Sequence, residues 1–256
     1  MFDFGSNWEK YSIRRLDSDR LAIAAQSLQS LLGLDSLSNA SFLDIGCGSG
    51  LFSIAAHELG AEVVVGLDIN PRCIIISSHN RKCYAPNAPI SFYEVSALCL
   101  KDLEKLGHFD IVYAWGVLHH TGAMWEAIRN TAHQVSPGGV LVLSIYNKHW
   151  TSPIWKSIKW IYNRSPGKIQ WVMVVLFSGI IYLAKLLVTG RNPLIKERGM
   201  DFWYDVIDWI GGYPYEYAHP DDVKTFVTDL DFELCNYVPA QVPTGCNEFV
   251  FERCEE

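Results

Sequence analysis

Phe42-Leu43-Asp44-Ile45-Gly46-Cys47-Gly48-Ser49-Gly50 is the stretch of sequence that decides the fold. A short apolar run ends in three glycines separated by single residues, and a helical pattern begins at Leu51. This order predicts a buried strand, a tight turn and the start of a helix. Glycine has no Cβ, so such a turn lets the backbone approach a ligand closely.

Two common ligand loops do not fit this turn. A Walker loop needs Gly-Lys-Ser/Thr, which is absent, and a dinucleotide fingerprint needs G-x-G-x-x-G, whereas position 51 is leucine. A second apolar run, residues 61–67, ends in Asp68, 18 residues after Gly50. A carboxylate there can accept hydrogen bonds from both hydroxyls of a ribose but would repel a ribose phosphate.

The composition limits the remaining possibilities. A chain of 256 residues, 49% of them hydrophobic, can form one large domain or one domain with an elaboration. The net charge of −7 argues against a general nucleic-acid binder. The seven cysteines form no C-x-x-C pair, so we expect reduced thiols, no metal site and a cytoplasmic protein. No uninterrupted apolar run reaches the length of a membrane span.

Strands and helices alternate along the chain. The predicted strands are 41–45, 63–68, 90–94, 109–114 and 140–146, separated by helices at 51–59, 70–83, 100–106 and 123–135. A helix at 219–229 and a hairpin of strands 232–238 and 247–253 follow. This pattern predicts an α/β fold with a doubly wound, mostly parallel sheet, in which ligands bind beyond the carboxyl ends of the strands. Asp44, Asp68, Ser96 and Trp115 all lie at such ends.

These residues resemble class I S-adenosylmethionine (SAM) methyltransferases over positions 41–146 and 219–253. The D-x-G-x-G-x-G motif from Asp44 to Gly50 resembles their first motif, and Gly116-Val117-Leu118-His119-His120 resembles the matching segment of quinol-methylase-like bacterial members. Pro137-Gly138-Gly139-Val140-Leu141 resembles the strand that follows. The resemblance implies a Rossmann-like sheet of seven strands with an antiparallel last strand, and SAM as the methyl donor.

The resemblance also assigns the cofactor residues. Gly46, Cys47, Gly48 and Gly50 would pass near the methionine part of SAM, and Asp44 would hold its ammonium through the loop or a water. Asp68 would bind the ribose hydroxyls.

The same resemblance extends the assignment to the adenine. Ile69 would pack on the ring, and Ser96 and Ala97 would lie near its amine, although many family members have an acid there. Trp115 would meet SAM at the turn after the fourth strand.

The N-terminal segment, residues 1–39, precedes this sheet, and two interpretations are open. Its apolar helix from Asp19 to Leu34 can cover one edge of the sheet. Alternatively, Trp8 and Tyr11 close over the site, with Tyr11 on the cofactor and Trp8 on the acceptor.

Methyl transfer from a sulfonium is an in-line displacement and needs a base only when the nucleophile carries a proton. His119 is the first candidate base, and Asp201 and Glu216 are further candidates. Each has a purely structural alternative: a histidine that bonds its loop, a solvated helix face shared by Asp201, Asp205 and Asp208, or a carboxylate that stabilises a turn. The acceptor side is assigned to His120, Tyr146, Asn147 and Asp205, besides Trp8.

Residues 148–218 read as a helical insertion between the fifth and sixth strands. No acidic residue occurs between Glu126 and Glu197, whereas lysines, arginines and tryptophans are frequent and residues 169–184 are uncharged. Basic segments flanked by tryptophan are typical of membrane surfaces, so a peripheral contact through 150–188, at the inner face of a membrane, is one hypothesis. The others are a lid over the site and a patch for an anionic substrate.

The leading hypothesis is SAM-dependent methyl transfer to a small-molecule acceptor, at oxygen, with a lipid-like, quinol or glycan-type substrate. A methyltransferase acting on RNA or protein is the second. It is disfavoured by the acidic balance and by Tyr113-Ala114-Trp115-Gly116, which occurs where an N/D-P-P-Y/F motif would stand. A noncatalytic SAM-binding regulator is the third.

Overall fold

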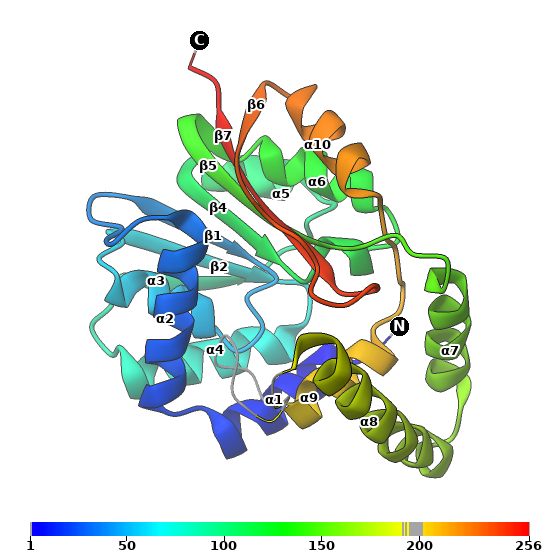
Figure 1. Ribbon diagram of the computed structural model, residues 1–256. Helices are drawn as coiled ribbons and strands as arrows, with labels where there is room; N and C mark the ends of the chain where they lie inside the picture. Colours follow the sequence, from blue (N-terminus) through cyan, green and yellow to red (C-terminus); the bar gives the residue numbers. More distant parts are fainter. Residues whose placement is uncertain (1, 191, 193, 195–201, 256) are drawn as a thin grey trace.

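The computed structural model describes residues 2–190, 192, 194 and 202–255. A seven-stranded sheet runs through its centre in the order β3-β2-β1-β4-β5-β7-β6 (Figure 1). The strands are β1 (Ser41–Ile45), β2 (Val63–Asp68), β3 (Ile90–Glu94), β4 (Phe109–Trp115), β5 (Val135–Tyr146), β6 (Phe232–Val238) and β7 (Cys246–Arg253). β7 is antiparallel to β5 and β6, and the other pairs are parallel. The predicted sheet is confirmed.

The helices up to β5, and the one before β6, follow the alternation of the sequence. They are α1 (Phe4–Arg15), α2 (Ser18–Leu32), α3 (Leu51–Glu58), α4 (Pro71–Tyr84), α5 (Leu100–Leu103), α6 (Met124–Ala132) and α10 (Pro220–Thr228), with 3₁₀ turns η1 (Glu104–Leu106) and η2 (Leu118–His120). Asp17 caps α2 by accepting from the Arg20 N–H, and Gly33 ends that helix in the left-handed conformation.

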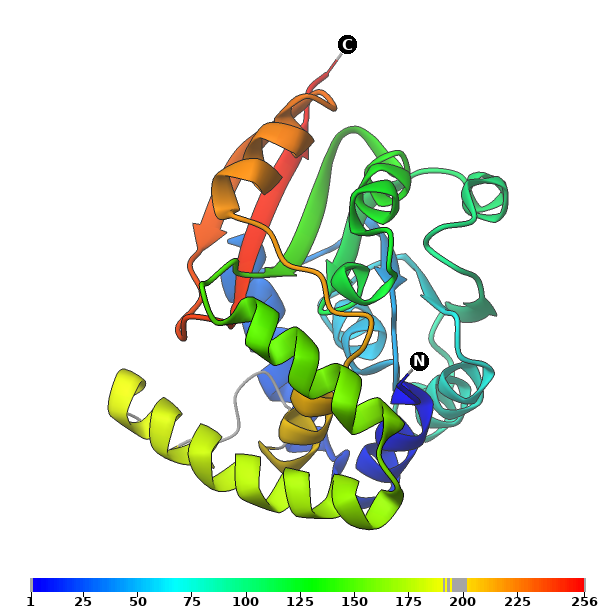
Figure 2. The same cartoon turned by 90° about the vertical axis from the view of Figure 1, so that its right-hand side faces the viewer.

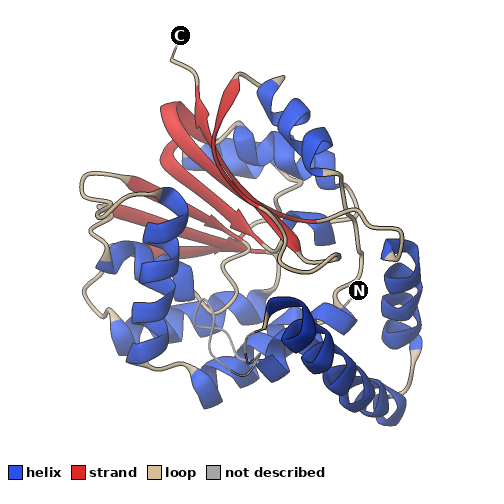
Figure 3. Ribbon diagram, in the orientation of Figure 1, coloured by secondary structure: helices blue, strands red, loops and turns tan. Residues whose placement is uncertain are grey.

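Helices lie on both sides of the sheet (Figure 3), and two buried apolar clusters pack against its two faces. Successive residues of β1 point to opposite faces, so Leu43 and Ile45 join one buried cluster and Phe42 joins the other. The first cluster includes residues of α5, α6 and α10, and the second includes residues of α1, α2 and α3. With both faces covered, the carboxyl ends of the parallel strands remain the place where a ligand can approach the sheet.

The predicted boundary between α6 and β5 is wrong. The helix was expected to reach Val135, but it ends at Ala132, and Val135 already belongs to β5. Phe109 pairs with Val135 and Ile111 pairs with Val140, so the register shifts across Pro137-Gly138-Gly139. A strand carrying extra residues in a bulge has no regular alternation, which hides its beginning in the sequence.

The N-terminal aromatic stretch, which showed no clear period, forms α1. Helix α1 packs on α4 and on α9 (Phe202–Gly211), far away in sequence. Between β5 and β6 the chain also forms α7 (Ser152–Arg164) and α8 (Gly167–Thr189). Tyr162, Val174, Val206 and Ile210 give these three helices a small buried cluster of their own. Figure 2 shows α7 and α8 at the bottom of the view, at the end of the molecule opposite the C-terminus.

Candidate active site

A cavity of about 750 Å³ lies beyond the carboxyl ends of β1, β2, β4 and β5. Residues of α1, α8 and α9 form the opposite wall, and the loop between β6 and β7 closes one side. A volume of this size is typical of small-molecule and cofactor sites.

The glycine loop brings backbone close to this cavity. Gly46 and Gly48 have φ of +74° and +54°, in the left-handed region that favours glycine. A Cβ on Gly46 would lie 2.4 Å from Cγ2 of Val117, and one on Gly48 would lie 3.0 Å from Cε2 of Trp8. Both positions are therefore closed to side chains. Of this loop, Gly46 and Cys47 line the cavity together with Ser49, whereas Gly48 and Gly50 stand behind them.

Asp44 is a carboxyl group almost withdrawn from solvent at the end of β1. It is 3% exposed, lines the cavity and accepts a hydrogen bond of 2.6 Å from the Ser53 hydroxyl. Burial raises its pKa to about 7, with a smaller contribution from the charge of Asp68, and the hydrogen bonds from Ser53 oppose the rise. A buried carboxyl facing a cavity is suited to receive a cation.

Asp68, at the end of β2, is the second carboxylate of the cavity. Its Oδ2 accepts from the Gly48 N–H at 3.1 Å, and its Oδ1 accepts from the Asn70 N–H at 2.8 Å. Burial raises its pKa, and these two backbone N–H groups oppose the rise. Asp68 also lines the cavity, so its oxygens can accept hydrogen bonds from a ligand there.

The wall next to Asp68 is apolar and flat. Ile69, Ser96 and Ala97 line the cavity, and the Ser96 hydroxyl accepts from the Leu98 N–H at 3.2 Å. Trp115 lines the cavity from the end of β4, and its indole N–H donates to Glu248 at 3.1 Å.

His119, on η2, is a buried histidine at the end of the cavity away from Asp44 and Asp68. It is 1% exposed and lines the cavity, and neither ring nitrogen has a hydrogen-bond partner among the described residues. Burial, followed by the charges of His120 and Lys159, lowers the pKa of His119 well below its ordinary value. The ring is therefore a neutral imidazole, 4.1 Å from the ring centre of Tyr146.

His120 faces the same end of the cavity but is already bonded. Its Nδ1 donates to the Pro214 carbonyl at 2.7 Å, because a carbonyl can only accept. Burial, helped by the charge of Lys159, lowers its pKa to about 3. Tyr146, at the end of β5, also lines the cavity.

Helix α9 brings Asp205 and Asp208 to the cavity, and Asp201 lies outside the described residues. Asp208 accepts a hydrogen bond of 2.8 Å from the Asn7 side chain, which also donates to the Tyr204 carbonyl. Burial raises the pKa of Asp208 to about 8; the Asn7 hydrogen bond opposes this and the charge of Asp205 adds to it. Two of the three aspartates expected on one helix face therefore line a cavity.

Lys159 is an unexpected buried cation next to the cavity, although it does not line it. In the sequence, Lys156 and Lys159 lie off the helical face that carries Ile154, Ile158 and Ile161, but Lys159 is fully buried and its ammonium donates to the Trp209 carbonyl. The ammonium lies 4.7 Å from the ring centre of Tyr215 and 5.4 Å from that of Tyr146. Burial lowers its pKa to about 7. Ile154 and Ile161, on the apolar side of the same helix, are exposed instead.

Residues 16–179 match a family model described as a methyltransferase domain, which is more than half of the chain. The chain belongs to this family. The predicted class I fold and enzyme class are confirmed, and so is SAM as the cofactor of the family.

The relatives of this methyltransferase have names that describe different reactions. The tRNA U34 carboxymethyltransferase of Hahella chejuensis is 34% identical over 111 residues, 43% of this chain and 33% of its own. The ubiquinone biosynthesis O-methyltransferase of Bradyrhizobium sp. is 32% identical over 119 residues, 46% of this chain and 45% of its own. The methyltransferase thus spans less than half the length of these curated relatives. Their names point to different acceptors.

A solved structure supports the fold of the methyltransferase over nearly its whole length. The magnesium protoporphyrin IX methyltransferase of Synechocystis PCC 6803, with bound SAH, superposes with a TM-score of 0.59 at 16% identity. The match covers 97% of this chain and 93% of the other.

The residues of the methyltransferase fit its cofactor. SAM carries an ammonium, a ribose with two hydroxyls and an adenine, and the cavity offers a buried carboxyl at Asp44, the carboxylate oxygens of Asp68 and an apolar wall at Ile69. A side chain at Gly46 would collide with Val117, so the close backbone approach is built into the loop. No group of three metal-ligating side chains occurs in the described part of the chain.

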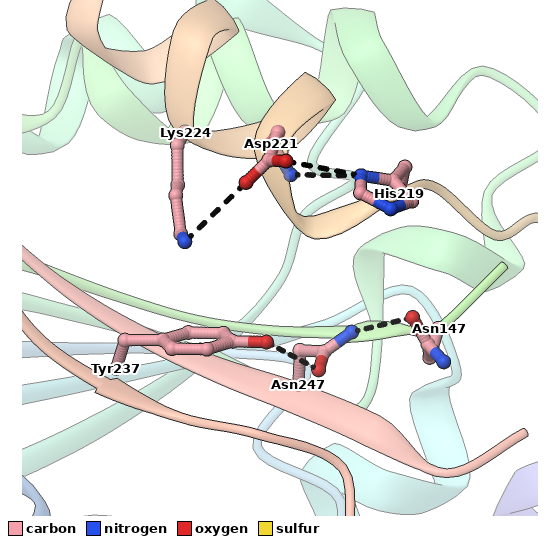
Figure 4. A network of polar contacts seen from close by, with 6 residues as sticks. All are labelled: Asn147, His219, Asp221, Lys224, Tyr237 and Asn247. Atoms are coloured by element: carbon pink, nitrogen blue, oxygen red, sulfur yellow. Dashed lines mark hydrogen bonds and ion pairs between the residues drawn. The ribbon is translucent and has the colours of Figure 1, made fainter. Parts of the chain in front are cut away.

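Besides Gly48 and Gly50, three residues assigned to the site of this methyltransferase do not line the cavity. Tyr11 is 1% exposed and packs behind Trp8, with its ring centre 5.9 Å from that of Tyr204. Asn147 is bonded to the Pro243 carbonyl and to Asn247, whose Oδ1 accepts from the Tyr237 hydroxyl (Figure 4).

Glu216 is the third of them, and it accepts from the backbone N–H groups of Gly122 and Met124 at 2.9 and 3.2 Å. Its carboxylate therefore stabilises the start of α6. Trp8, in contrast, lines the cavity from α1.

Proposed function

We propose that this methyltransferase transfers the methyl group of SAM to an oxygen of a small acceptor with an apolar part, of the lipid-like, quinol or glycan type. The observation that carries the proposal is His119: a buried, neutral imidazole with no hydrogen-bond partner among the described residues, at the aromatic end of the cavity. A neutral ring nitrogen can accept the proton of a hydroxyl.

The cofactor end of the cavity would be held by the strand ends. Asp44 would receive the ammonium and Asp68 the ribose hydroxyls, while Ile69 and Ala97 would cover the adenine. When bound, SAM supplies a methyl group on a positively charged sulfur, ready for in-line displacement. The chain's own contribution is to align the acceptor with that group and to keep water away.

The acceptor end is aromatic and apolar. Tyr146 and Trp209 line it beside His119, and Ile181 of α8 lines it from the insertion. Such a wall excludes water from an oxygen nucleophile and favours an acceptor with an apolar body. Asp208 lines the same end, and its raised pKa adds a carboxyl that can stay protonated near neutrality and donate to the acceptor.

The experiment is methyl transfer from labelled SAM into three separated fractions of a cell extract: lipid-extractable metabolites, total RNA and total protein. We expect label in the first fraction, on oxygen by mass spectrometry. His119→Gln should lower kcat by about 10²- to 10⁴-fold, the usual contribution of a general base, and should leave the SAM Kd unchanged.

The matched control is His79→Gln, because His79 is an exposed histidine on α4 away from the cavity. It should behave like the parent. Label found only in RNA or in protein would replace the small-molecule proposal by the macromolecular one. Unchanged kcat in His119→Gln would remove the base, and label in no fraction despite SAM binding would favour a regulatory protein.

A further inference from the structure

Helix α8 leaves a long apolar face uncovered. Six residues at helical spacing are each 48–82% exposed: Ile169, Val172, Leu176, Ile180, Leu183 and Leu187. The most apolar 18-residue window within Gly167–Val188 has a mean hydropathy of 2.2, and only 6% of it is buried. By length and composition the helix could cross a membrane. The sequence predicts no membrane span here, because polar residues interrupt the apolar run. A face of this size marks an interaction surface.

In the neighbouring helix α7, polar side chains are buried and apolar side chains are exposed. Its buried residues are polar, Ser152, Lys159 and Tyr162, while Ile154 and Ile161 are exposed. A helix that only packed on a water-soluble core would show the opposite distribution. The two helices therefore present one outward-facing apolar surface, which we call the α7–α8 surface: the six residues of α8 with Ile154 and Ile161.

Cations and tryptophans border the α7–α8 surface. Lys156, Arg164 and Lys168 are exposed there, and no acidic residue occurs between Glu126 and Glu197, although the whole chain carries −7. Trp150 and Trp171 are 77% and 64% exposed. Amphipathic tryptophan rings and lysines around an apolar face match the headgroup region of an anionic bilayer. The charge segregation disfavours a second copy, because each cationic surface would face another.

The neighbours of α8 decide how it can lie in such a bilayer. Helices α7 and α9, which precede and follow it, touch each other: the Asn163 amide donates to the Gly211 carbonyl at 2.7 Å, and the Trp155 and Trp209 ring centres are 4.0 Å apart. A single crossing by α8 would put α7 and α9 on opposite sides of the membrane and break these contacts. The helix therefore lies in the plane of the interface.

We propose that the α7–α8 surface docks the protein on an anionic lipid bilayer, with α8 lying in the interface plane, and that the acceptor enters the cavity from that bilayer. The second part rests on the proposed function. It is supported by Ile180 and Val188, which are exposed and also line the cavity, so that α8 separates the site from the docking side.

The test is flotation of the purified full chain with vesicles of phosphatidylcholine alone and of phosphatidylcholine mixed with phosphatidylglycerol. We expect flotation with the anionic vesicles, lost at least tenfold in Leu176→Glu/Leu183→Glu and weakened about tenfold in Lys156→Gln/Lys168→Gln. Alkaline carbonate should release the bound protein, as it does proteins that lie on a membrane.

The matched controls make the same kinds of substitution elsewhere on the surface. Leu34→Glu/Ile75→Glu alters two other exposed apolar residues, and Lys82→Gln/Lys101→Gln removes two other exposed lysines. Both should float like the parent. Circular dichroism and the SAM-induced rise in Tm establish that each variant is folded.

Three outcomes would overturn the docking. The first is that the protein floats with neither kind of vesicle, and the second is that carbonate does not release it. The third is that the parent is a dimer in light scattering, that Leu176→Glu/Leu183→Glu makes it a monomer, and that neither protein floats. The acceptor path is tested separately, by adding the acceptor identified above inside vesicles or in detergent. Equal kcat/KM for the parent and the glutamate variant on vesicles would remove the path, whereas no transfer in either medium would instead remove the proposed function.

Discussion

Asp44 and Asp68 end neighbouring strands, yet the fold treats the two carboxyl groups differently. Asp68 accepts from two backbone N–H groups, which stabilise its charge. Asp44 lies deeper and accepts from the Ser53 hydroxyl, so burial dominates and its pKa rises to about 7. The cofactor end of the cavity therefore holds a carboxyl that titrates near neutrality, close to where a cationic ligand is expected.

This difference makes SAM affinity dependent on pH. In the proposed function the ammonium of SAM would bind the ionised form of Asp44, and below about pH 7 the free protein holds this group protonated. The Kd for SAM should therefore rise as the pH falls below 7, by up to about tenfold per pH unit. Calorimetry across this range measures it. Asp44→Asn should bind SAM weakly with no such slope, and an equal slope in this variant would exclude Asp44 as the cause.

At the scale of an element, Glu216 belongs to the start of α6. Its carboxylate accepts from two N–H groups there, as a capping side chain does. Glu216→Ala should lower the free energy of unfolding by about 1 kcal/mol in urea denaturation and leave kcat near that of the parent. Glu62→Ala, at an exposed position, is the control. A loss of kcat of about a hundredfold with unchanged stability would restore Glu216 as a base.

Lys159 gives α7 a buried amine whose pKa is lowered from 10.5 to about 7. The folded protein then binds fewer protons than the unfolded chain between these values. Stability from this group is therefore lost as the pH falls from about 10 toward 7 and gained as it rises. Asp208 acts in the opposite sense below about pH 8, so the comparison is made above that pH.

The expected result is a difference in slope. Urea denaturation between pH 8 and 10 should show the parent gaining up to about 1.4 kcal/mol per pH unit relative to Lys159→Met, which keeps the volume of the side chain. Lys156→Met, on the exposed side of α7, should keep the parent's slope. Parallel curves for the parent and Lys159→Met would show that the buried amine keeps its proton across this range, so that folding does not lower its pKa.

At the scale of the whole molecule, the cavity joins three parts that are distant in sequence: the strand ends, α1 and the helices α8 and α9. A cofactor held there stabilises the folded state by mass action. SAM at about 100 times its Kd adds about 2.7 kcal/mol, which for a chain of this size raises Tm by about 5 to 10 °C.

Differential scanning fluorimetry measures this rise in Tm. Asp68→Ala should abolish most of it because the proposed ribose contacts would be lost, and Glu62→Ala should retain it. A full rise in Asp68→Ala would place the cofactor away from β2.

The sequence by itself determined the sheet and which carboxyl groups meet at the proposed cofactor end of the cavity. Strand periodicity and the glycine turn fix β1, β2 and the positions of Asp44 and Asp68, because residues at the carboxyl ends of adjacent parallel strands must come together. Regular alternation of side chains and a turn that requires glycine are both local backbone constraints, so the sequence alone shows them.

Only the tertiary structure decided the rest. Tyr11 and Glu216 carry groups suited to a site, but contacts with residues distant in sequence turn them away from the cavity. Lys159 is buried and Ile161 exposed, the reverse of what their polarity predicts. The burial of a side chain depends on what packs against its helix, and α9, which covers α7, lies beyond another helix in the chain. Periodicity reports that a helix has two faces, and only its neighbours decide which of them meets the core.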